Sequence, residues 1–180
     1  LLRATIEDIR ASPNTFWIGM GDIVDAVGRF DKRHREGVMA TWLRGEERVF
    51  AAQRAKAIEY LKPIGHKCLA YLQGNHEDHL LKAVGADLYY SVIEGIQPTD
   101  DADLAMGMSG FLLLKFQRCD EGDRKGGTAT FRFFLHHGYG GGALKGGKII
   151  GLERLPGRYA ADVYMMGHNH DKIATPFNRV

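Results

Sequence analysis

Four short apolar segments of the sequence each lead to a glycine and to residues of the types that bind metal ions. The segments are 16–18, 68–72, 131–135 and 163–166, and they run into Asp22, Asn75-His76-Glu77, His136-His137 and His168-Asn169-His170. Side chains at the ends of neighbouring strands can meet at one edge of an open α/β sheet, where such sheets place their sites. The pattern therefore predicts that oxygen and nitrogen ligands converge on a metal centre.

Length, composition and charge exclude several classes of protein. A chain of 180 residues fits one domain over 1–180, and its 44% hydrophobic content is enough for a core. A net charge of +2 is too small to indicate nucleic-acid binding by itself. No apolar stretch is long enough to span a membrane. Cys68 and Cys119 have no metal-type spacing, and without a signal-peptide pattern we expect a cytoplasmic location.

The apolar spacing predicts a mixed α/β fold. Leu2, Ile6 and Ile9 lie at helical spacing, which predicts a helix at the start of the chain. Further helices are expected at 36–43, 46–61 and 79–84, strands at 16–19, 67–72, 111–116, 128–135 and 162–166, and loops at 28–35, 120–127 and 138–151. Early alternation of helices and strands, followed by a hairpin, favours a sheet with a parallel and an antiparallel part. The opening helix needs a sheet to pack on, so we expect that an earlier strand has been lost or lies outside the numbered chain.

Two of the motifs supply carboxylate, amide and imidazole groups. Asp22 can bridge two cations, and Gly21 before it allows a sharp turn, although a capping aspartate is the alternative. The amide oxygen of Asn75 suits a divalent ion. His76 is a candidate general acid near neutral pH, and Glu77 is expected to orient its imidazole. The alternative for these three residues is a polar turn after a strand.

The other two motifs supply histidines. His168 and His170 would point to one side in extended backbone, so that each reaches a different metal ion. A surface loop is the alternative. His136 and His137 are adjacent and would point to opposite faces of a strand. We predict His137 as the ligand, because Gly138 lets the loop open beside it, and His136 as a structural histidine.

The motifs together resemble those of the calcineurin-like metallophosphoesterases. They are Gly-Asp-x-x-Asp at 21–25, Gly-Asn-His-Glu at 74–77, His-Gly at 137–138 and Gly-His-x-His at 167–170. Each is weak alone, but four in this order over most of the chain are specific. The resemblance implies a two-layer mixed β-sandwich flanked by helices, a four-layer α/β/β/α arrangement.

The resemblance also implies two divalent ions about 3.5–4 Å apart. Asp22 would bridge them, Asn75, His137 and His168 would complete the shell of the second ion, and His170 would bind the first. The family also has an Asp-x-His motif on its first strand, and this motif is absent here. The first ion would then keep only Asp22 and His170 as ligands. The full family site holds two ions, but in this chain we expect the first position to bind its ion weakly or to be empty.

The implied reaction is hydrolysis of a phosphate ester, by a phosphodiesterase or phosphatase. A metal-bound hydroxide would attack phosphorus, and His76 would assist departure of the leaving oxygen. Asp25 and Glu77 would support the ligands rather than bind metal. The oxygen and imidazole donors suit manganese, iron, zinc or nickel.

The substrate is expected to be a phosphate ester, including nucleotides and nucleic acid. Candidate phosphate contacts are Arg29 and Arg33 in a basic cluster after Asp22, and Lys145 and Lys148 in a glycine-rich segment. The alternatives for these segments are a solvated helix start and a plain flexible loop. Nothing in the sequence requires a membrane or a particular oligomeric state.

Two other functions remain open. A catalytically impaired binding module on the same fold would account for the missing first motif, although a scaffold has no need of His76 as a leaving-group acid. A DNA-binding accessory domain has only the basic cluster at 29–35 in its favour.

Overall fold

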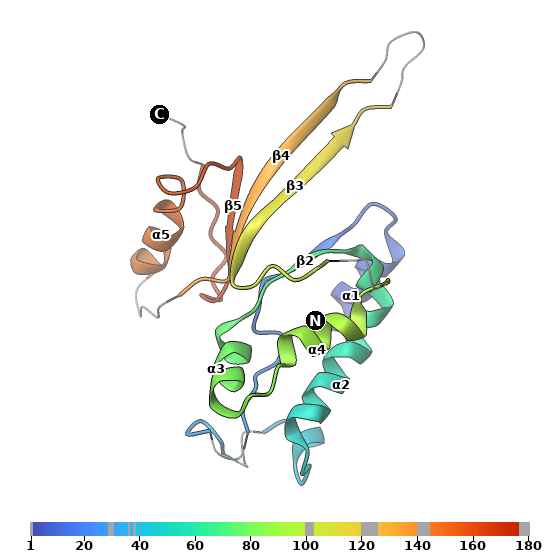
Figure 1. Ribbon diagram of the computed structural model, residues 1–180, viewed down its shortest axis with the longest axis vertical. Helices are drawn as coiled ribbons and strands as arrows, with labels where there is room; N and C mark the ends of the chain where they lie inside the picture. Colours follow the sequence, from blue (N-terminus) through green and yellow to red (C-terminus); the bar gives the residue numbers. More distant parts are fainter. Residues whose placement is uncertain are drawn as a thin grey trace. The chain divides into compact units, whose positions relative to one another are not determined.

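The chain folds into two compact units of mixed α/β structure, Leu1–Gly107 and Met108–Val180 (Figure 1). A computed structural model describes residues 2–28, 31–35, 37, 39–99, 103–119, 126–139 and 145–176. The α/β class agrees with the sequence prediction. The four-layer sandwich and the single domain over 1–180 remain predictions.

The first unit combines one parallel strand pair with several helices. Its elements are α1 (Leu2–Ala11), β1 (Trp17–Gly19), η1 (Thr41–Leu43), α2 (Val49–Leu61), η2 (Lys62–Lys67), β2 (Cys68–Tyr71), α3 (Asn75–Val84) and α4 (Leu88–Ile96). Strands β1 and β2 run parallel, so their carboxyl ends lie at the same edge. The loop after β1 and the start of α3 therefore lie next to each other.

Aromatic side chains form the centre of the core of the first unit. Tyr71 is buried and lies with its ring centroid 6.1 Å from Trp17 and 6.0 Å from Tyr89. The Tyr89 hydroxyl donates to the Tyr71 carbonyl at 2.9 Å and accepts from the Gly107 N–H at 2.9 Å. Because a Cβ at Gly19 would come within 2.6 Å of the Tyr71 ring, glycine is needed at the end of β1.

The second unit is a three-stranded sheet with one helix. Its elements are β3 (Ser109–Gln117), β4 (Thr128–His136), α5 (Lys145–Glu153) and β5 (Val163–Met166), and the strand order is β3-β4-β5. Strands β3 and β4 form the predicted antiparallel hairpin, and β5 pairs parallel to β4 (Figure 1). Phe134 is buried in this unit and stacks on Tyr159, with 3.9 Å between ring centroids.

Several helix predictions need correction. A helix was expected over 36–43, but among the described residues of this range only Thr41–Leu43 are helical, as the 3₁₀ turn η1. Residues 36 and 38 lie outside the described part of the chain. Helix α3 begins at Asn75 rather than at 79, and α4 was not predicted. Segment 145–153 is helix α5 rather than loop, because Leu152 packs against the buried cluster of Phe134, Leu155 and Ala161 and this packing outweighs the low helix propensity of glycine.

No helix among the described residues combines the length and apolar character needed to cross a membrane.

Candidate functional site

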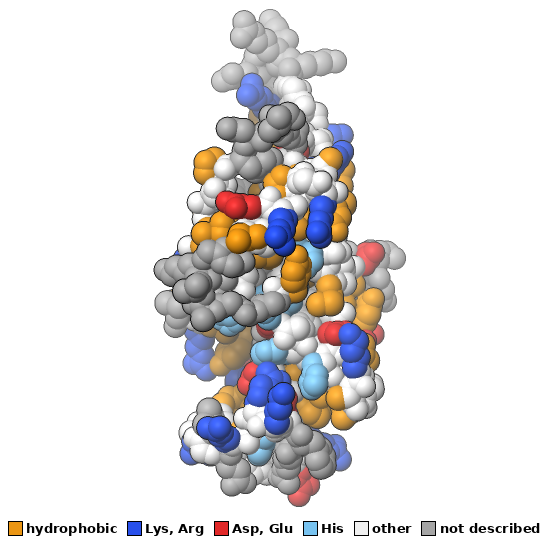
Figure 2. Space-filling view, turned by 90° about the vertical axis from the view of Figure 1, so that its left-hand side faces the viewer, with side chains coloured by type: hydrophobic (Ala, Val, Ile, Leu, Met, Phe, Trp, Pro, Cys, Tyr) orange, Lys and Arg blue, Asp and Glu red, His pale blue; other side chains and the backbone are white. Residues whose placement is uncertain are grey.

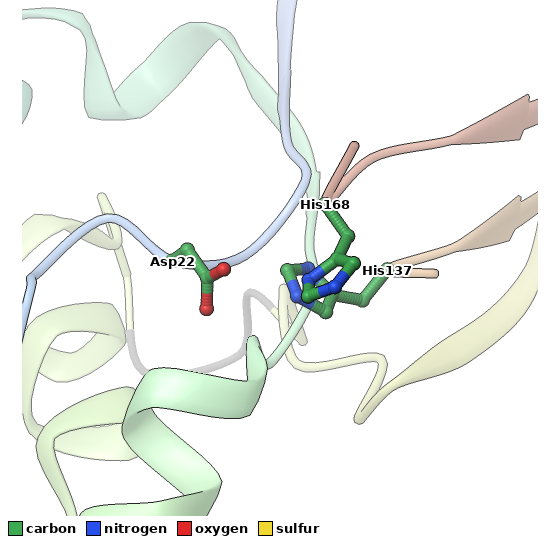
Figure 3. Close-up of side chains that lie close together, drawn as sticks. All are labelled: Asp22, His137 and His168. Carbon is green, nitrogen blue, oxygen red and sulfur yellow. The ribbon is translucent and has the colours of Figure 1, made fainter. Parts of the chain in front are cut away.

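Asp22 lies on a sharply turned loop directly after β1 (Figure 3). Gly21 has φ 88° and Asp22 has φ 54°, so two successive residues have positive φ. Such a backbone is unfavourable for a residue with a Cβ and persists only where surrounding contacts hold it. The expectation that glycine permits a sharp turn before Asp22 is confirmed.

Glu77 supplies the contacts that hold this loop. Its carboxylate accepts the backbone N–H groups of Asp22 at 3.1 Å, Ile23 at 2.9 Å and Val24 at 3.3 Å. It also accepts the N–H of Gly74 at 3.0 Å. Only 3% of Glu77 is exposed, and burial raises the pKa of its carboxyl above the ordinary value. Glu77 is thus a support, as expected, but it orients backbone rather than the His76 imidazole.

Gly74 allows the loop and helix α3 to approach closely. A Cβ at this position would collide with the backbone nitrogen and Oδ1 of Asp22, and would come within 2.5 Å of Glu77 Oε2. The His76 N–H, in the first turn of α3, donates to Asp22 Oδ1 at 3.0 Å. The Gly-Asn-His-Glu motif therefore holds Asp22 at its carboxylate, through the His76 N–H, and at its backbone, through Glu77, and it places Asn75 at the first position of the helix.

The His76 imidazole lies between an acidic and a basic side chain. Its Nδ1 is 3.5 Å from Asp25 Oδ1, and its Nε2 is 3.3 Å from Arg33 Nη1. Arg33 is itself bound by Asp31, with 2.7 Å between Nη2 and Oδ2. The hydrogen bonds from Arg33 hold the pKa of Asp31 far below its ordinary value. Because a guanidinium only donates, His76 Nε2 accepts from Arg33 when the ring is neutral.

A polar groove of about 800 Å³ adjoins His76. Its basic lining residues are Lys32, Arg33 and Lys82, and its other lining residues are Asp31, Asn75, His76, Asp78 and His79. Acidic, basic and histidine side chains lie next to one another on the face drawn in Figure 2. The mixture of cations and imidazoles is suited to holding a phosphate group.

His137 and His168 lie together within the second unit (Figure 3). His137 directly follows β4 and is fully buried, and its N–H donates to the Met108 carbonyl at 2.9 Å. His168 follows β5, and its ring meets that of His137 edge to face, with 5.3 Å between centroids. Gly138 has φ 103°, and a Cβ there would come within 2.9 Å of the His168 Cβ. Glycine after His137 thus permits the two imidazoles to be neighbours.

The other two histidines of these motifs behave differently. His136 Nδ1 accepts the Gly138 N–H at 2.7 Å, and partial burial lowers the pKa of His136. This local hydrogen bond agrees with a structural role. His168 has φ 67° and His170 has φ 53°, so the extended backbone expected for this motif is wrong. His170 is exposed, whereas His168 is half-buried.

The predicted phosphate contacts are only partly described. Arg33 lies beside His76, with 3.3 Å between Nη1 and Nε2. Arg29 lies outside the described residues, and of Lys145 and Lys148 only the backbone, in α5, is described. Asp31 was not singled out in the sequence, although it accepts both the N–H and the side chain of Arg33. An aspartate two residues before an arginine is the local signal that could have indicated this turn.

Comparison of the chain with protein-family models, with curated proteins and with solved structures finds no match.

Proposed function

We propose that the protein hydrolyses phosphate esters with a divalent metal ion held by Asp22, His137 and His168. The observation that carries the proposal is the junction of the Asp22 loop with α3. There the Asp22 carboxylate accepts the backbone N–H of His76, and the His76 imidazole lies against the Arg33 guanidinium. We further propose that the protein belongs to the calcineurin-like metallophosphoesterases, has their four-layer sandwich fold and is cytoplasmic. The proposal also includes Asn75 and His170 as further ligands.

The donor set fits a divalent metal ion. Asp22, His137 and His168 are a group of described side chains that could hold one. Carboxylate oxygen and imidazole nitrogen without thiolate suit manganese, iron, zinc or nickel. When bound, such an ion would supply a Lewis acid that activates water and offsets charge on the phosphate.

Arg33 and His76 would act on the phosphate and the leaving group. The acid form of His76 is the imidazolium, and its Nδ1 lies 3.5 Å from the Asp25 carboxylate. Because protonated Nε2 no longer accepts, the Arg33 Nη1 group becomes available to donate to a phosphate oxygen. The Nε2 proton can then pass to the leaving oxygen, an assistance worth about 10²–10⁴-fold in rate.

A chromogenic phosphodiester with added Mn²⁺ tests the proposal. We expect turnover by the wild type, a loss of about 10²-fold or more in His76→Ala and a loss of similar size or larger in Asp22→Asn. Asparagine keeps an oxygen that can accept the His76 N–H, so the fold should survive. His66→Ala, an exposed histidine in η2, is the matched control and should keep wild-type activity.

Absence of turnover with Mn²⁺, Fe²⁺, Zn²⁺ and Ni²⁺ in a folded protein would overturn the enzymatic proposal. That result would favour a binding module instead. Unfolding curves for all three variants show whether a loss of activity reflects chemistry or stability.

A further inference from the structure

A second pocket, of about 380 Å³, lies in the first unit and is mainly apolar. Its apolar lining includes Ile23 and Val24 on the loop after β1, and Met39, Trp42 and Leu43 around η1. Pockets for small molecules typically measure about 300–1,000 Å³ and are mostly apolar with a few polar groups. This pocket therefore has room for a base with its sugar and lies near the small end of that range.

Exposed apolar side chains gather at this pocket. Trp42 is 48% exposed, Leu2 58% and Ile23 37%, and all three line the pocket. A soluble surface rarely groups large apolar side chains without a ligand or partner to cover them. A half-exposed tryptophan at a pocket offers a flat surface on which an aromatic ring can stack.

Asp25 and Arg33 connect this pocket to His76. Both side chains line the apolar pocket, and both approach the His76 ring, at 3.5 Å and 3.3 Å. Arg33 also lines the polar groove. A molecule seated in the apolar pocket would thus place a neighbouring phosphate against Arg33 and His76.

We propose that this pocket binds the nucleobase of the substrate, so that the substrates are nucleoside phosphate esters. This inference rests on the proposed function. Arg33 and Arg35 supply positive charge at the pocket, which complements a phosphate attached to the sugar.

The lining also indicates how selective the pocket is among bases. The Gln53 amide lines the pocket, but its oxygen already accepts the Ala26 N–H at 2.9 Å and its nitrogen donates to the Val27 carbonyl at 3.4 Å. Because both groups of the Gln53 amide are already hydrogen-bonded, the base would be recognised by stacking on Trp42 rather than by hydrogen bonds to Gln53. Stacking tolerates all four bases because each has a π face.

Binding of AMP to the metal-free protein tests the inference. We expect AMP to bind about tenfold or more tightly than ribose 5-phosphate by calorimetry, and GMP and CMP to bind within about fivefold of AMP. Trp42→Ala should weaken AMP binding about 5–100-fold, and Trp42→Phe, which keeps an aromatic face, should weaken it less. Tyr90→Ala removes an equally exposed aromatic ring on α4, away from the pocket, and should leave AMP affinity unchanged.

Two outcomes would overturn the inference: ribose 5-phosphate binding as tightly as AMP, or unchanged AMP affinity in both Trp42 variants. Turnover of the chromogenic ester together with either outcome would leave the proposed function standing. AMP binding that depends on Trp42, with no turnover of any ester, would overturn the proposed function and retain the pocket.

Discussion

At the scale of single residues, most of the described non-glycine residues with positive φ are proposed metal ligands. They are Asp22, His168 and His170, and Ala26 is the exception. Each such residue costs about 1–3 kcal/mol and persists where other contacts determine its conformation. For Asp22 those contacts are the Glu77 carboxylate and the close approach permitted by Gly74. The strain therefore supports a functional role for the loop.

Gly74→Ala tests the close approach. The new methyl group would collide with Asp22 and Glu77, so we expect the free energy of unfolding to fall by about 1–3 kcal/mol and phosphodiester turnover to fall with it. Urea unfolding measures the first effect. Gly37→Ala is the matched control, because a Cβ there meets nothing within 4 Å. Equal stability of Gly74→Ala and Gly37→Ala would contradict the close packing of Gly74 against Asp22 and Glu77.

At the scale of elements, α4 shows how a helix can fix a neighbouring strand. Asp87 caps the helix by accepting the Tyr90 N–H at 2.9 Å. The buried side chains of α4 recur at helical spacing and face the core: Leu88, Tyr89, Val92, Ile93 and Ile96. Through its hydroxyl, Tyr89 joins the end of β2 to Gly107. The element that delivers the Asn75-His76-Glu77 motif is thus supported by a helix that follows it in the chain.

Tyr89→Phe tests this support. The substitution removes the hydrogen bond from the Tyr89 hydroxyl to the buried Tyr71 carbonyl and the hydrogen bond from the Gly107 N–H to the same hydroxyl. We therefore expect the free energy of unfolding to fall by about 1–3 kcal/mol. Tyr90→Phe removes an exposed hydroxyl from the same helix and should change stability little. Denaturant unfolding of both variants makes the comparison, and an equal effect in the two would argue against the role of the Tyr89 hydroxyl.

At the scale of the whole molecule, the proposed metal ligands come from segments that are far apart in the chain. Asp22 follows β1, and His137 and His168 follow β4 and β5. A metal ion bound by all three residues should bind less tightly when any one of them is replaced.

Metal titration of single variants tests this dependence. We expect Asp22→Asn and His168→Ala each to lower Mn²⁺ affinity about tenfold or more, since even outer-shell changes cost about 10–100-fold at metal sites. EDTA should abolish turnover, and Mn²⁺ should restore it. His79 lines the polar groove but is not a proposed ligand, so the His79→Ala variant should keep the metal affinity of the wild type. Unchanged affinity in Asp22→Asn would mean that the two histidines bind metal without Asp22.

The sequence by itself determined the chemical groups and most of the strands that carry them. Strands β2, β4 and β5 lie within a residue or two of the predicted ranges, because apolar patterning is a property of neighbouring residues. The residue types that suit a metal ion could be read in the same way, as could the glycines at Gly21 and Gly138 that permit sharp turns.

Tertiary structure alone decided what those groups contact. Besides Gly74, the Glu77 carboxylate accepts backbone N–H groups more than fifty positions away, and the left-handed turn at His168 has no local signature. Helix α5 forms in a glycine-rich segment because packing of Leu152 against the buried cluster of the second unit outweighs the low helix propensity of glycine. Local sequence specifies local geometry, whereas close approach between distant segments depends on how the whole chain packs.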